Sequence, residues 1–156
     1  MIATLLSAAL TIPPPPDWQP PRFEGPVLMC GSTYGLSLVA GENATLSWPG
    51  EVFINDVFST FTVATPRGAV VVTENGPTTR PSGAGRRDGR VGTRFIMNHG
   101  GGVYSVQVAT AGNIRAVTLR FPATFAAADR RALLTRLRAA PSAAQCGRPV
   151  SGSIGA

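Results

Sequence analysis

The only histidine, His99, is the residue with the clearest capacity for proton transfer, since imidazole titrates near neutral pH. Ser105 follows it closely, so a pair of nucleophile and base is conceivable. The chain has no G-x-S-x-G elbow and no evident acid to orient the histidine, and Gly100, Gly101 and Gly102 follow it directly. The sequence therefore favours a turn histidine over a catalytic one, and no catalytic residue is assigned.

Arginines form the strongest candidate binding group. Guanidinium groups bind carboxylates and phosphates through paired hydrogen bonds, so a cluster of them predicts a patch for anionic lipid, polysaccharide or phosphate. The other interpretation is a solvated loop that is rich in arginine because of coding bias. Aromatic residues do not alternate with these arginines as stacking platforms would, so nucleic acid is not an expected partner. The candidate ligand-binding residues are Arg80, Arg86, Arg87, Arg90 and Arg94.

Two cysteines, Cys30 and Cys146, lie near the two ends of the main part of the chain. A structural zinc site needs four closely presented donors, and one histidine cannot complete it. We therefore expect a Cys30–Cys146 disulfide, with two free buried thiols as the alternative. No metal or other cofactor is expected.

The carboxylates are scattered singly, most of them beside Gly, Pro or Asn in expected turns. A glycosidase can bring two distant acids together in space, so this spacing does not exclude that class. A small hydrolase whose site is assembled from dispersed residues such as His99, Asp56 and Tyr104 is the alternative function.

The charge of the chain is basic and comes entirely from arginine. Fourteen basic residues oppose eight acidic ones, which gives a net charge of +6 with no lysine in the sequence. The absence of lysine excludes a P-loop lysine, a Schiff base and a lysine general base. The positive charge favours acidic partners.

The first residues resemble an export signal in composition. Residues 1–12 are apolar, with small residues at 7–9, but no basic residue precedes them. The prolines from Pro13 onward interrupt this run before it is long enough to cross a membrane, so no transmembrane span is expected. We expect export to the periplasm or the medium, with residues 13–26 as a proline-rich leader.

Short alternating apolar runs, separated by turn residues at intervals of about 8 to 12, predict an antiparallel β structure for residues 27–146. Between 78 and 92 the apolar pattern stops, and Gly and Arg dominate, which predicts a mobile loop. Residues 124–140 carry a helical apolar face with Asp129 early and arginines late, which suits the helix dipole. A Gly/Ser-rich tail at 147–156 is expected to be flexible.

These patterns predict a single domain of mainly β class, an antiparallel sandwich or open barrel of about seven to nine strands with one C-terminal helix packed on it. The expected function is a non-enzymatic binding or structural role at the cell envelope. The expected partner is an anionic envelope component or another protein.

Overall fold

The computed structural model describes residues 13–48, 57–76, 85–110 and 113–152. Within these ranges the chain is mainly antiparallel β structure, as the alternating pattern predicts. The elements are β1 (Arg22–Glu24), β2 (Val27–Cys30), β3 (Tyr34–Leu38), β4 (Asn43–Leu46), β5 (Val57–Thr65), β6 (Gly68–Asn75), β7 (Arg86–Val91), β8 (Arg94–Gly100), β9 (Val103–Thr110), β10 (Asn113–Arg120), α1 (Ala127–Leu134), β11 (Leu137–Ala139) and a short 3-10 turn (Ala143–Gln145).

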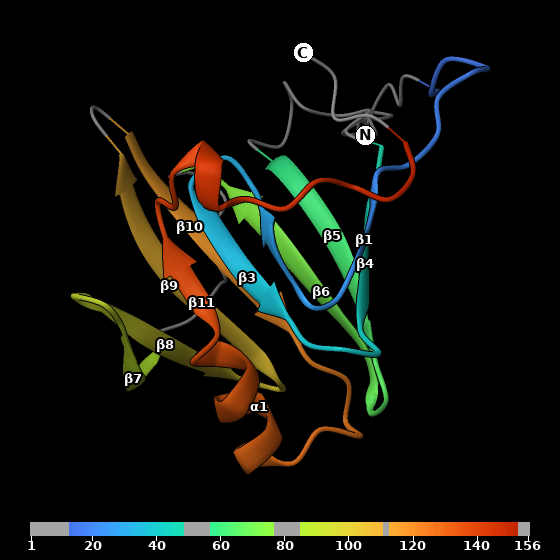
Figure 1. The fold of residues 1–156 in the computed structure, drawn as a ribbon. Helices are drawn as coiled ribbons and strands as arrows, with labels where there is room; N and C mark the ends of the chain where they lie inside the picture. Colours follow the sequence, from blue (N-terminus) through green and yellow to red (C-terminus); the bar gives the residue numbers. More distant parts are fainter. Residues whose placement is uncertain (1–12, 49–56, 77–84, 111–112, 153–156) are drawn as a thin grey trace, which may run out of the picture.

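The strands form two sheets that lie one on the other (Figure 1). The larger sheet has eight strands in the order β1-β4-β5-β6-β10-β9-β8-β7, and the smaller has three in the order β11-β3-β2. β1 and β7 are opposite edges of the large sheet and do not pair with each other, so the sheet is open. The described strands number eleven rather than seven to nine, because three-residue strands such as β1 and β11 carry too short a pattern to be recognised.

The core lies between the two sheets. Successive side chains of a strand point to opposite faces, and on β6 the alternate residues Val70, Val72 and Glu74 have no measurable exposure. Leu36 of β3 belongs to the same apolar cluster as Val72 and Leu119 of the large sheet, and each has no measurable exposure. Leu133 and Leu134 of α1 belong to the same cluster, so the helix packs on the sheets as expected.

Both ends of the described chain are tied to the body. Cys30 at the end of β2 and Cys146 form a disulfide with a sulfur–sulfur distance of 2.09 Å, which confirms the predicted pair. The tail does not fray at Gly147: its backbone N–H donates to Leu28, and Arg22 and Ser151 form an isolated bridge. Residues 147–151 thus contact β1 and β2, while 153–156 lie outside the described residues, and the flexibility of the tail stays a prediction.

The helix is shorter than the predicted range of 124–140. α1 ends at Leu134, and β11 follows it, because the free edge of β3 accepts Leu137–Ala139 as a third strand. Arg136 at the change of direction makes two hydrogen bonds to the Glu42 carboxylate, at 2.7 and 3.0 Å. Pairing with a sheet edge outweighs the good helix propensity of Arg and Ala here.

The proline-rich leader is irregular from 13 to 21 and then enters the large sheet as β1. Trp18 packs edge-on against Trp48 with ring centroids 5.1 Å apart, and Phe23 is buried against Phe61. The leader is thus part of the domain rather than a free spacer. The suggested signal segment, 1–12, lies outside the described residues.

Candidate functional site

The candidate arginines lie on a β hairpin at one edge of the large sheet. Arg86, Arg87 and Arg90 are on β7, the edge strand, and Arg94 begins β8. The prediction of a mobile loop over 78–92 is therefore wrong for residues 86–91, because their backbone pairs with β8 in spite of the polar side chains. Arg80 lies outside the described residues. In Figure 1 this hairpin occupies the end of the large sheet away from β1.

A bulge in β7 decides where these side chains point. The register with β8 shifts between Arg87 and Arg90, where Gly89 has a φ of 119°. Residues three apart on a regular strand lie on opposite faces, whereas an inserted residue brings them to the same face. Both guanidinium carbons lie over the ring of Phe95, at 4.0 Å for Arg87 and 4.3 Å for Arg90.

No carboxylate of the described residues forms an ion pair with the arginines of this hairpin. Arg86, Arg87, Arg90 and Arg94 are exposed, and the ion pairs found among the described residues do not include them. Asp88, between them in sequence, instead contacts the Asn98 side chain at 3.2 Å and Arg131 of α1 at 3.3 Å. Four cations therefore face solvent on two neighbouring strands.

Phe95 and Gly89 were not among the predicted site residues. The sequence offered a weak signal for Phe95, which is the one aromatic residue close to the arginines in the chain. The bulge at Gly89 had no signal, since several other glycines of this stretch look alike.

His99 and Ser105 do meet on the large sheet. The imidazole Nε2 lies 2.7 Å from the Ser105 hydroxyl, and Nδ1 is buried without a hydrogen-bond partner among the described residues. If Nδ1 carried the proton, a buried N–H donor would be unsatisfied, which is costlier than an unsatisfied acceptor. The favoured tautomer therefore donates from Nε2 to Ser105, which does not activate the hydroxyl as a nucleophile.

Of the other residues suggested for a dispersed hydrolase site, Tyr104 does not join His99 and Ser105. Tyr104 precedes Ser105 on β9, so the two side chains point to opposite faces of the sheet. Tyr104 is buried in the core, where its ring packs edge-on against Phe121 and its hydroxyl lies 3.3 Å from the Asn98 amide. Asp56 lies outside the described residues. The backbone of Gly85 further crowds His99, because a Cβ at Gly85 would lie 2.8 Å from the imidazole Cε1.

A buried polar network lies between the two sheets and is centred on the carboxylate of Glu74. Glu74 follows Val70 and Val72 on the core-facing side of β6 and has no measurable exposure. Its oxygens accept hydrogen bonds from the Ser32 N–H at 2.9 Å and the Thr33 hydroxyl at 2.7 Å, and Arg115 lies 3.1 Å away. Ser32 and Thr33 belong to the turn after β2, whereas Glu74 and Arg115 belong to the large sheet. The network therefore connects that turn to the large sheet.

Tyr34 lies beside this network. Burial raises the pKa of its phenol well above the ordinary value, and the negative charge of Glu74 raises it further, whereas the Ser59 hydroxyl acts in the opposite direction. The phenol makes no hydrogen bond of good geometry among the described residues. A neutral, enclosed phenol is a structural group rather than an accessible acid.

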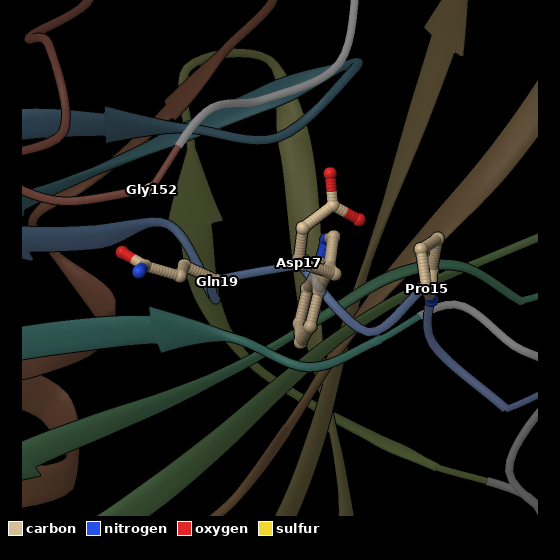
Figure 2. A pocket seen from close by; sticks show the side chains of 5 residues that line it. Pro15, Asp17, Gln19 and Gly152 are labelled. Atoms are coloured by element: carbon tan, nitrogen blue, oxygen red, sulfur yellow. The ribbon is translucent and has the colours of Figure 1, made fainter.

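A shallow hollow of about 360 Å³ lies on the leader and is lined by Pro15, Asp17, Trp18, Gln19 and Gly152. Figure 2 shows the Asp17 carboxylate and the Gln19 amide pointing in different directions. Binding sites for small molecules usually have polar groups that converge on one point. This hollow therefore ranks below the arginine hairpin as a site.

Two negative findings apply to the described part of the chain only. It contains no group of three or more His, Cys, Asp or Glu residues arranged to hold a metal ion. It also has no helix whose length and hydropathy would suit a membrane crossing.

Comparison with protein-family models, with curated proteins and with solved structures found no match to this chain. Together, the fold and the site define a β domain of two sheets, of which the larger is open. A disulfide links Cys30 to Cys146, and an arginine hairpin lies at one edge of the large sheet. Any function must be argued from these residues themselves.

Proposed function

We propose that this chain is an exported domain, periplasmic or secreted, that binds an anionic component of the cell envelope through its arginine hairpin, β7–β8, without catalysing a reaction. The observation that carries the proposal is the group of four exposed arginines on neighbouring strands without carboxylate partners among the described residues. Like charges held close together repel, so a sheet that keeps them there gains from an anionic partner.

Export is supported by two features. The apolar residues at 1–12 suit a signal segment, and the Cys30–Cys146 disulfide is typical of an oxidising compartment. The test is the intact mass of protein from an export-competent host, with thiol alkylation before and after reduction. A shortened amino terminus and thiols that alkylate only after reduction are expected. A full-length chain with two free thiols would overturn the export proposal.

Binding is tested by cosedimentation with vesicles that contain anionic phospholipid, over a series of salt concentrations. Binding is expected to weaken as salt rises, because the contacting charges are exposed and therefore screened. The triple variant Arg86→Ala, Arg87→Ala, Arg90→Ala is expected to lose most of this binding.

The matched control removes the same amount of charge elsewhere. Arg22→Ala, Arg120→Ala and Arg148→Ala change exposed arginines of β1, β10 and the tail. If this control loses as much binding as the hairpin variant, the net charge binds and the hairpin does not.

The alternative, a small hydrolase, is supported by one contact, His99 Nε2 to Ser105 Oγ at 2.7 Å. A fluorophosphonate that labels activated serines separates the two functions. Because the favoured tautomer leaves Ser105 unactivated, no labelling is expected in the wild type. Labelling that disappears in Ser105→Ala and in His99→Ala would establish the hydrolase instead.

A further inference from the structure

The arginine hairpin has an arrangement more specific than a basic patch. The guanidinium carbons of Arg87 and Arg90 lie 4.0 and 4.3 Å from one ring centroid, so they are no more than 8.3 Å apart. The bulge at Gly89 brings the two side chains to this common ring. We call Arg87, Phe95 and Arg90 the arginine clamp.

From this arrangement we infer that the arginine clamp binds a phosphate group. The inference rests on the proposed function and names the chemistry that the hairpin recognises. The ring of Phe95 attracts both cations through its π electrons. The two exposed cations, no more than 8.3 Å apart, form a region of concentrated positive charge that a single anion can contact.

The shape of the anion follows from the number of donors. One bidentate guanidinium fork already takes up the open edge of a carboxylate, whose two oxygens lie in one plane. A second fork that approaches from another direction needs further oxygens, and a tetrahedral phosphate provides them. The two separate forks of the arginine clamp therefore suit a phosphate better than a carboxylate.

The neighbouring acidic group does not compete for this position. Asp88 is engaged by Asn98 and Arg131, at 3.2 and 3.3 Å. The clamp lies on the edge hairpin of the large sheet (Figure 1), so a phosphate carried by a large object such as a lipid surface or an envelope polymer can reach it.

The test uses the full chain and two kinds of probe. Nuclear magnetic resonance follows the side-chain Nε–H signals of the arginines during titration with inorganic phosphate or with acetate at equal ionic strength. Phosphate is expected to shift the signals of Arg87 and Arg90 more than those of Arg94 and Arg148, and acetate is expected to shift them much less. Equal responses to phosphate and acetate would overturn the inference.

The matched variants keep the charge and change only the geometry. Arg87→Lys with Arg90→Lys retains both cations but removes the planar forks, so phosphate affinity is expected to fall about tenfold or more. Arg148→Lys, on the exposed tail, is the control. Phe95→Leu removes the ring that orients the guanidinium groups and is expected to lower affinity in the same direction.

The same variants distinguish the source of the phosphate. They also separate a failure of the arginine clamp from a failure of the proposed function. Vesicles with phosphatidylglycerol test a lipid source, and a soluble glycerol phosphate oligomer tests a polymer source. If the lysine variant binds vesicles as the wild type does, the clamp is wrong while the arginine hairpin still serves as a general anion site. If the wild type binds no anionic vesicle or oligomer, the proposed function itself fails.

Discussion

At the scale of single residues, Glu74 is a buried charge that connects the turn after β2 to the large sheet. A carboxylate without exposure requires partners for its oxygens, and here an ion pair and hydrogen bonds from both sheets supply them. Removing the charge would take the ion pair with Glu74 away from the partly buried Arg115 guanidinium. Glu74 therefore has a structural role, because it holds the turn after β2 against the large sheet, rather than a catalytic one.

The variant Glu74→Gln keeps the shape and removes the charge. It is expected to lower the free energy of unfolding by about 2 to 3 kcal/mol, because one partner of a buried ion pair is lost. Urea denaturation measures this change. The control is Glu24→Gln, which breaks the half-exposed pair with Arg22 and is expected to cost less than about 1 kcal/mol. If both variants lose the same free energy of unfolding, the buried Glu74 ion pair stabilises the fold no more than the half-exposed pair of Glu24 with Arg22.

Tyr34 gives a prediction for alkaline pH. Its folded-state pKa is raised above the ordinary value of 10.0, so above that pH the unfolded phenol loses its proton while the folded one keeps it. Stability contributed by the neutral phenol is therefore present below about pH 10 and is lost as the pH rises further. Tyr34→Phe is expected to show a shallower loss of stability above pH 10 in urea denaturation at several pH values. A curve parallel to that of the wild type would contradict the assignment.

At the scale of elements, the bulge of β7 is the feature that converts a basic strand into a possible binding surface. It depends on Gly89, because a φ of 119° is outside the regions open to other residues. Without the bulge, Arg90 would lie on the face opposite to Arg87. One glycine thus determines which charges meet.

Gly89→Ala is expected to lower stability by about 1 to 2 kcal/mol and to separate Arg90 from Phe95. Denaturation measures the first effect, and the Nε–H signal of Arg90 reports the second. Gly92 in the turn of the same hairpin is the control: its φ of 56° is the left-handed region that asparagine also adopts. Gly92→Asn is expected to stay within about 0.5 kcal/mol of the wild type and to leave the Arg90 signal unchanged.

The elements also show what sequence patterns can and cannot reveal. The alternating apolar runs of residues 27–146 predict the β class correctly, because burial on one face of a strand leaves a direct trace in the sequence. β11 lies inside the predicted helix because its stability comes from pairing with β3, a partner far away in the chain. The candidate arginines were identified by type, whereas their meeting on Phe95 depends on a backbone bulge that composition does not encode.

At the scale of the whole molecule, the disulfide joins segments separated by 116 residues. A crosslink over so long a loop restricts the unfolded chain strongly and is expected to contribute about 4 to 5 kcal/mol in the chain-entropy model. The double variant Cys30→Ser, Cys146→Ser should lose about that amount in urea denaturation. The control is the wild type with reductant, which should match the variant. A loss below about 1 kcal/mol would show that the turn and tail contacts alone close the domain.

The class of the fold could be predicted at this scale, and so could the disulfide, because periodicity and cysteine number are properties of the whole chain. The attachment of the tail could not, since it rests on backbone contacts such as Gly147 N–H to Leu28 that carry no side-chain signal. The buried Glu74 had a signal, namely a carboxylate at a core-facing position of a valine-rich strand. Because Glu74 follows Val70 and Val72 at intervals of two, the sequence pattern predicts that its carboxylate is buried.

The pairing of the two chain ends sets the order in which the molecule is completed. A ribosome or an export channel delivers the amino-terminal residues first, yet Cys30, β1 and β3 all await partners from residues 137–151. Contacts so distant in sequence form late, after the long loop between them has closed. A partly delivered chain therefore has no finished small sheet and no crosslink between Cys30 and Cys146. The domain is complete only when residues 137–151 have been delivered.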